Sequence, residues 1–184
     1  MAKREATIDD LYKVEGKAEI VCGEIRHFMA TGDEPGWAGD SIFAALLEYM
    51  RRTKKGRAVS DNKGFHVNLP NRKSFSPDAA YYIGPRFGMR FFEGAPVFAV
   101  EVRSENDYGP KPEREMAEKR ADYFAAGTKV VWDVDLLNPN VVQKYTADNP
   151  NTPTIFTKGE IADAEPAVPG WTMSVDALFL TDEE

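Results

Sequence analysis

The sequence has 184 residues, of which 42% are hydrophobic and 29% are charged, and its net charge is -7. This length suits a single domain, residues 1–184, that buries about two-thirds of the surface of its unfolded chain. The negative charge argues against broad affinity for nucleic acid, because that affinity comes from many basic contacts with phosphate. The single cysteine, Cys22, excludes an intrachain disulfide framework and a zinc site built on sulfur ligands.

The N-terminal sequence MAKREATIDD lacks the apolar core of a signal peptide, and no stretch reaches the ~18 apolar residues of a membrane helix. We therefore expect a cytoplasmic protein without a membrane span. Residues 1–17 mix charged and small residues and are predicted to be a loosely held segment with at most a short helix over 8–13. Residues 18–29 alternate apolar and polar side chains on either side of Gly23, which predicts a hairpin.

The first core helix is predicted over residues 40–54, where apolar side chains recur at helical spacing. The stretch before it, TGDEPGWAGD at 31–40, is predicted to be a loop because of its glycines and proline. The basic cluster RRTKKGR at 51–57 ends this helix, where cations meet the negative end of the helix dipole. The alternative is a patch that contacts phosphate, joined by Lys63, Arg72, Lys73 and Lys111.

Short apolar runs rich in Val, Phe and Tyr predict further strands. They lie at 58–60, 65–69, 76–82, 96–103, 129–135, 141–145 and 154–157, with a turn at 149–153 and a closing element over 171–179. The two histidines, His27 and His66, have no partner at metal-ligand spacing. Their placement disfavours a zinc hydrolase.

Two of these strands each carry a carboxylate that packing alone would not select. Asp78 opens the run at 76–82, and Glu101 lies inside the run at 96–103. A carboxylate in an apolar strand costs several kcal/mol if it is ionised and unpaired, so Glu101 is paired, protonated, metal-bound or at a strand end that reaches solvent. If the two strands are antiparallel neighbours, both acids fall at one end of the sheet and can bind a hard divalent cation.

A helix is predicted over residues 112–126, with Pro112 in its first turn and Gly127 after its end. Lys119 lies on the flank of its apolar face, from where the ammonium can reach the two acids. Arg120 projects closer to the middle of that face and is the alternative cation. The helical pattern alone favours Arg120.

These features resemble the Uma-type restriction endonuclease family of the PD-(D/E)XK nuclease superfamily. The similar strings, in the order of the family, are AEIVCGEI, SPDAAYY, FAVEVRS, KRADYFAAGTKVVWDVD and VPGWTMSVDALF. The resemblance implies an α/β (α+β) fold with a restriction-endonuclease-like core, in which two main helices flank a mixed central sheet and an extra hairpin precedes it. It further implies an endonuclease that hydrolyses phosphodiester bonds in DNA with Mg²⁺ or Mn²⁺.

The resemblance also implies roles for individual residues. Asp78 and Glu101 are similar to the metal-binding acids of the family, the main-chain carbonyl of Val102 to its backbone ligand, and Lys119 to its catalytic lysine. Glu19 matches an acid that the family often has. It either reaches the metal site or is a solvated strand residue.

Two positions depart from the pattern. The superfamily has a lysine where this chain has Arg103, and arginine is a poor general base. Either Lys119 replaces that lysine, or the chain is a non-catalytic nucleic-acid-binding or scaffold module that retains the fold. Glu105 stands where the family usually has a proline, which affects the shape of the loop. Strand count alone would also allow a small all-β ligand-binding barrel, although the two helices argue against it.

The family resemblance implies a homodimer as well. Exposed aromatic side chains would serve such a contact. The candidates are Trp37, Phe87, Phe91 and Phe92.

Overall fold

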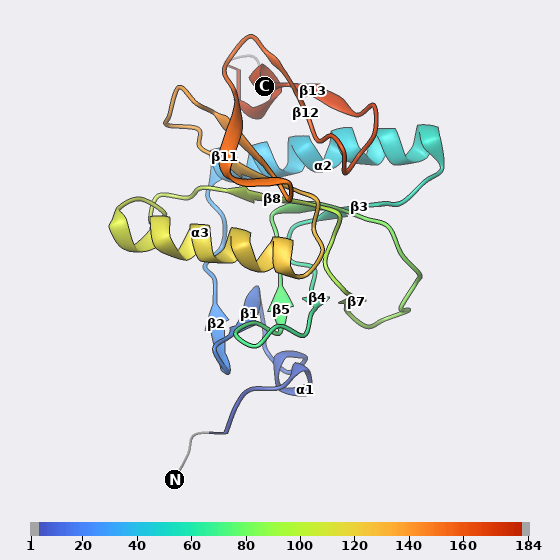
Figure 1. The fold of residues 1–184 in the computed structure, drawn as a ribbon, viewed down its shortest axis with the longest axis vertical. Coiled ribbons are helices and arrows are strands. Elements are labelled where there is room, and N and C mark those ends of the chain that lie inside the picture. The colour runs from blue at the N-terminus through green and yellow to red at the C-terminus, as the bar shows by residue number, and fades with distance from the viewer. Residues whose placement is uncertain (1–3, 182–184) are drawn as a thin grey trace.

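The computed structural model describes residues 4–181, and its centre is a six-stranded mixed sheet (Figure 1). The strand order is β11-β10-β9-β8-β6-β3. The bounds are β3 Arg57–Ser60, β6 Ala79–Tyr82, β8 Phe98–Val102, β9 Val130–Val134, β10 Val142–Thr146 and β11 Asn149–Phe156. Strands β8 and β9 are parallel, and every other neighbouring pair is antiparallel. The parallel pair is connected by helix α3, Pro110–Ala125, as a parallel pair requires a crossover.

Helices α2, Asp33–Thr53, and α3 lie on opposite faces of this sheet (Figure 1). Successive residues of a strand point to opposite faces, so each strand divides its side chains between the two helices. In β8, Phe98 and Val100 pack in the core that includes α2, whereas Ala99 packs in the core that includes Tyr123 of α3. By the same alternation Glu101 faces α3. The sheet therefore directs the acid of β8 toward the helix that carries Lys119.

The N-terminal segments lie on the α3 side of the sheet (Figure 1). Helix α1, Ile8–Leu11, is followed by the hairpin of β1, Ala18–Val21, and β2, Glu24–His27. A three-stranded sheet consists of β4, Phe65–His66, β5, Ser74–Phe75, and β7, Phe92–Glu93. Hydrogen bonds from Ile20 N to Ser74 Oγ (2.9 Å) and from Lys73 N to Ile20 O (3.0 Å) attach the hairpin to this sheet.

The C-terminal segments cover α2 on the other face. They comprise β12, Ile161–Asp163, β13, Thr172–Ser174, and a 3₁₀ turn η1, Val175–Leu178. Their buried residues join α2 and the central sheet in one core, in which the indoles of Trp132 and Trp171 lie 5.3 Å apart. Among residues 4–181, no helix combines the length and the apolar composition that a bilayer-crossing segment requires.

The mixed sheet, the two main helices and the N-terminal hairpin are as predicted, and the all-β barrel is wrong because the sheet is open and two helices cover it. The loop predicted at 31–40 is also wrong, because α2 begins at Asp33. Pro35 lies in the first turn of this helix, where a missing N–H leaves no hydrogen bond unmade. The four aromatic residues proposed for a dimer contact, Trp37, Phe87, Phe91 and Phe92, are half-buried and not exposed.

Candidate active site

Asp78 and Glu101 lie beside each other at one end of the sheet. The antiparallel register pairs Ala79 with Val100, which places Asp78 opposite Glu101. Asp78 Oδ2 accepts a hydrogen bond from the main-chain N–H of Val102, 2.7 Å away, so its carboxylate contacts the peptide group that follows Glu101. Asp78 Oδ1 lies 2.6 Å from the ammonium of Lys17, the residue that precedes the hairpin strand β1.

Glu101 is held from the α3 side. Its Oε1 accepts hydrogen bonds from Lys119 Nζ at 2.8 Å and from the Tyr123 hydroxyl at 2.7 Å. These two donors are four residues apart and so share one face of α3. Burial raises the pKa of Glu101 to about 7, with a further contribution from the negative charges of Asp78 and Glu19. The carboxyl therefore changes its protonation state near neutral pH.

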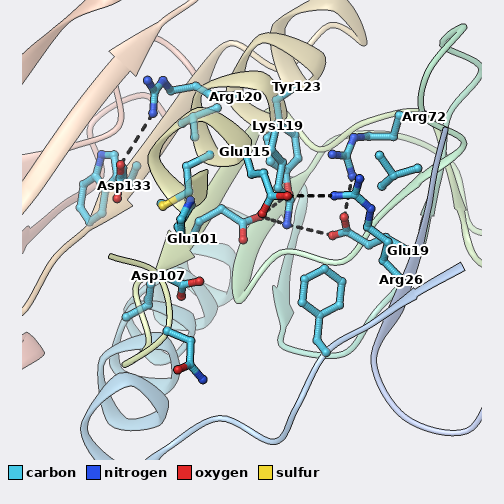
Figure 2. Close-up of a pocket in the computed structure, with 18 residues that line it drawn as sticks. Glu19, Arg26, Arg72, Glu101, Asp107, Glu115, Lys119, Arg120, Tyr123 and Asp133 are labelled. Carbon is cyan, nitrogen blue, oxygen red and sulfur yellow. Dashed lines mark hydrogen bonds and ion pairs between the residues drawn. The ribbon is translucent and has the colours of Figure 1, made fainter. Parts of the chain in front are cut away.

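Lys119 joins two acids that come from different strands. Its Nζ lies 2.8 Å from Glu101 Oε1 and 2.9 Å from Glu19 Oε1, and its side chain is only 14% exposed (Figure 2). Burial alone would lower the pKa of Lys119, but the carboxylates of Glu101 and Glu19 together raise it above its ordinary value. The side chain is therefore an ammonium at neutral pH.

Glu19 is buried, so the alternative of a solvated strand residue is wrong; its side chain is 1% exposed. One carboxylate oxygen accepts from Lys119 and from the main-chain N–H of Ser76, and the other lies 2.6 Å from Arg72 Nη1. Burial would raise the pKa of Glu19, yet Lys119 and Arg72 hold it below its ordinary value. Glu19 thus remains a carboxylate next to Glu101.

Three residues of this cluster lacked a usable signal in the sequence. Lys17 lies 61 residues from Asp78, and no local pattern links the two. Arg72 enters the sequence analysis only through the alternative of a phosphate-contacting patch, and that alternative is wrong for this residue because its guanidinium is buried and bonded to Glu19 and Asp122. Helical spacing assigns Tyr123 only to the apolar face of its helix, whereas in the structure its hydroxyl donates to Glu101.

Arg103 has a different function from the lysine of the superfamily pattern. Its Nε and Nη2 donate to the two carboxylate oxygens of Asp133 at 2.9 and 2.8 Å, and it also pairs with Glu113 on α3. Hydrogen bonds from its guanidinium to Asp133 raise the pKa of Arg103 above its ordinary value. The guanidinium is thus held in an ion-pair network, while Lys119 supplies the cation at Glu101.

Arg120, the alternative to Lys119, points to the same network. Its guanidinium lies 3.8 Å from the ring centroid of Tyr145. Its Nη1 lies 3.7 Å from Asp133 Oδ2 (Figure 2). The structure therefore places Lys119, and not Arg120, at Glu101, whereas Asp78 is paired with Lys17.

Two cavities meet at this cluster. One has a volume of about 180 Å³ and is lined by Glu19, Lys119 and Tyr123, among others. The other has a volume of about 610 Å³ and is lined by Lys17 and Asp78, among others. Glu101 lines both cavities, so a substrate in either one can reach its carboxylate.

The donor chemistry at this place fits a hard cation. Asp78 and Glu101 offer carboxylate oxygens, and Val102 offers a main-chain carbonyl. In the part of the chain that the structure describes, the only histidine or cysteine that lines either cavity is His27, in the larger one. Among residues 4–181, no three Asp, Glu, His or Cys side chains form a ready cage for an ion. Mg²⁺ does not require one, because it is usually held by one or two carboxylates and keeps several waters.

Comparison with known proteins places the chain in a family. A family model described as "Uma2: Putative restriction endonuclease" matches residues 7–176. The chain belongs to this family. The resemblance seen in the sequence is therefore confirmed, and no functionally curated protein matches at a significant level.

The fold of this Uma2 member is also found among solved structures. It is similar to the crystal structure of "a putative nuclease belonging to DUF820" from Anabaena variabilis, with a TM-score of 0.73 and 16% sequence identity. The similarity covers 95% of this chain and 97% of the other. The predicted fold class is confirmed by this similarity, and the family supports a nuclease.

Proposed function

We propose that this protein is an endonuclease that hydrolyses phosphodiester bonds in DNA and depends on Mg²⁺ or Mn²⁺. The observation that carries the proposal is the convergence of Glu19, Asp78, Glu101 and Lys119 from four separate elements of the chain. Structural packing alone does not call for three neighbouring carboxylates, because each must be desolvated and neutralised. Membership of the Uma2 family supports the proposal.

Asp78, Glu101 and the main-chain carbonyl of Val102 would hold the cation, with Glu19 beside them. A bound divalent cation lowers the pKa of a water molecule and neutralises charge that develops on the phosphate. In this structure the ammonium of Lys17 neutralises Asp78, so Lys17 must give up that contact when a cation binds.

Lys119 would act through its charge. Because its pKa is raised, it remains protonated and does not serve as a general base at neutral pH. Its ammonium can orient the attacking water or stabilise the negative charge of the transition state. Asp78, Glu101 and Lys119 are accordingly the proposed catalytic residues.

Nicking of supercoiled plasmid DNA tests the proposal. We expect the wild-type protein to nick the plasmid with Mg²⁺ or Mn²⁺ and to stop when EDTA is added. Asp78→Asn and Glu101→Gln should reduce nicking to background, because each removes a charge while keeping the side-chain shape. Asp148→Ala is the control, because Asp148 is an exposed residue between β10 and β11, and this variant should leave nicking unchanged.

Two results would contradict the proposal. Nicking that persists in both Asp78→Asn and Glu101→Gln would show that another site performs it. A wild-type protein that binds DNA but cuts none with either cation would instead support the non-catalytic module. Circular dichroism of each variant confirms that the fold is retained.

The same proposal includes a homodimer. The family resemblance implies this dimer, in which each chain would supply one such acid cluster. Light scattering should then give about twice the chain mass of 20.6 kDa. A mass of one chain under the conditions of cleavage would contradict this part of the proposal.

A further inference from the structure

We propose that strand β2 and the residue that follows it form a nucleotide clamp, in which Arg26 of β2 binds a substrate phosphate and Phe28, directly after β2, stacks on an unpaired base next to the cleaved bond. The inference rests on the proposed nuclease function and adds a substrate class, namely single-stranded or locally unpaired nucleic acid.

The hairpin fixes both residues beside the acid cluster. Arg26 is directly opposite Glu19 in the register of β1 and β2, so their side chains lie on the same face of the hairpin. Phe28 is two residues further along the chain, and its N–H donates to Lys17 O at 2.9 Å. Both residues line the smaller cavity together with Glu101 and Lys119. A nucleotide held by this pair would thus lie within reach of the proposed catalytic groups.

Arg26 is the cation of this cavity that can most easily accept a phosphate. Lys119 and Arg72 each lie within 2.9 Å of a carboxylate and are nearly buried. Arg120 also lines the cavity, but it is only 16% exposed and its guanidinium lies against the ring of Tyr145. Arg26 instead lies 3.7 Å from Glu115 on α3, and the two side chains are 49% and 45% exposed (Figure 2). Exposed pairs of this kind contribute little to stability, so a phosphate can replace Glu115. The planar guanidinium also suits two phosphate oxygens at once.

Phe28 presents an aromatic ring at the junction of the two cavities. The residue is 42% exposed and lines both cavities, as Glu101 does. The ammonium groups of Lys119 and Lys17 lie 5.5 and 5.9 Å from its ring centroid. The next residue, Met29, is 84% exposed and lines the larger cavity. A strand that passes from one cavity to the other would place a base on Phe28 and its phosphate near Glu101.

The Phe28 ring favours the binding of an unpaired strand over that of an intact duplex. Bases stack on exposed aromatic side chains regardless of sequence, because every base has a π-face. In a duplex both faces of a base are already stacked on its neighbours, and a base must leave the helix before a protein ring can contact it. The clamp therefore predicts tighter binding of an unpaired strand than of the same sequence in a duplex.

Fluorescence anisotropy with a labelled oligodeoxynucleotide, single-stranded or annealed to its complement, tests the clamp. The titrations are done in EDTA, so binding is measured without cleavage. Phe28→Ala should weaken single-strand binding about 5- to 150-fold and leave duplex binding nearly unchanged. Phe28→Trp should bind the single strand about as tightly as the wild type does, and the bound strand should quench the fluorescence of the new indole. Arg26→Ala should weaken the binding of both the single strand and the duplex. For the single strand, the slope of log K against log salt concentration should fall in magnitude by about 0.7.

Matched controls separate the clamp from general surface effects. Met89→Ala removes a fully exposed apolar side chain, and Arg86→Ala removes an exposed arginine of the loop between β6 and β7; both should bind as the wild type does. Equal losses on single strand and duplex in Phe28→Ala would overturn the clamp and assign Phe28 to shielding of the lysines. Absence of single-strand binding by the wild type would overturn it as well. Selective binding without any cleavage would support the clamp and contradict the proposed nuclease activity instead.

Discussion

Replacing Lys119 by methionine removes the ammonium that joins Glu19 and Glu101 and leaves a similar hydrophobic stem. In the wild type this ammonium lies 2.9 and 2.8 Å from the two carboxylates, at a place where all three side chains are mostly buried. Removing one partner of a buried ion pair costs about 3–5 kcal/mol, because the remaining charge stays desolvated. We expect a loss of this size at pH 8.

The loss should depend on pH because the pKa of Glu101 is about 7. This value is above the 4.5 of an ordinary glutamate, so the folded wild type binds the proton more tightly than the unfolded chain does. The contribution of Glu101 to stability is therefore full below pH 4.5 and is lost as the pH rises through 7. At pH 5.5 Glu101 is already protonated and needs no cation, and we expect Lys119→Met to cost about half as much as at pH 8.

Urea unfolding followed by the fluorescence of the buried tryptophans measures this effect. Lys111→Met, an exposed lysine on the same helix, serves as the control and should change stability by less than about 0.5 kcal/mol. In a Glu101→Gln background, Lys119→Met should cost about 1–3 kcal/mol less than in the wild type. An equal cost at both pH values and in both backgrounds would refute the electrostatic link between Lys119 and Glu101.

Three further predictions follow from the same cluster. Mn²⁺ affinity, measured by calorimetry, should fall about tenfold per pH unit below pH 7, because Glu101 must lose its proton to bind a cation; an affinity that is constant from pH 5.5 to 8 would contradict this. Lys17→Met should tighten Mn²⁺ binding about tenfold by removing the ammonium at Asp78, and weaker binding would assign Lys17 a supporting role. Arg103→Lys should lower the free energy of unfolding by about 1.5–3 kcal/mol, because it loses the two-oxygen contact with Asp133. The rate of plasmid nicking should stay within a few-fold of wild type. Abolished nicking in a stable variant would contradict the structural assignment of Arg103.

The pairing of Asp78 with Glu101 could be anticipated because it depends on local patterns. Each acid interrupts a short apolar strand, and the glycines and prolines between the strands indicate a direct return of the chain. Antiparallel pairing of neighbouring strands then brings the acids to one end of the sheet. An acid in an apolar strand is a strong signal of a site because burying a carboxylate without a partner costs free energy.

The choice of the cation could not be settled in the same way. Helical periodicity favours Arg120 over Lys119, since it measures only the direction of a side chain around the axis. In the structure Arg120 stacks on Tyr145, and Arg103 takes both oxygens of Asp133. Which cation reaches Glu101 is decided by these neighbours, which come from β8, β9 and β10.

Two other features depend on contacts that are distant in sequence or on weak local signals. Lys17 pairs with Asp78 only because the hairpin is attached to β5, and nothing near Lys17 in the sequence encodes that contact. The N-terminal turns of α2 contain Pro35, Gly36 and Gly39, whose low helix propensity predicts a loop. There Ala38 and Gly39 are buried within the helix, so packing outweighs propensity.

The central claim is that Asp78 and Glu101 hold a divalent cation beside Lys119. Anomalous scattering from crystals soaked in Mn²⁺ locates the ion directly. The account predicts a peak at coordination distance from carboxylate oxygens of both Asp78 and Glu101, with the ammonium of Lys17 moved away from Asp78. A peak elsewhere, or no peak at Mn²⁺ concentrations that support cleavage, would contradict it.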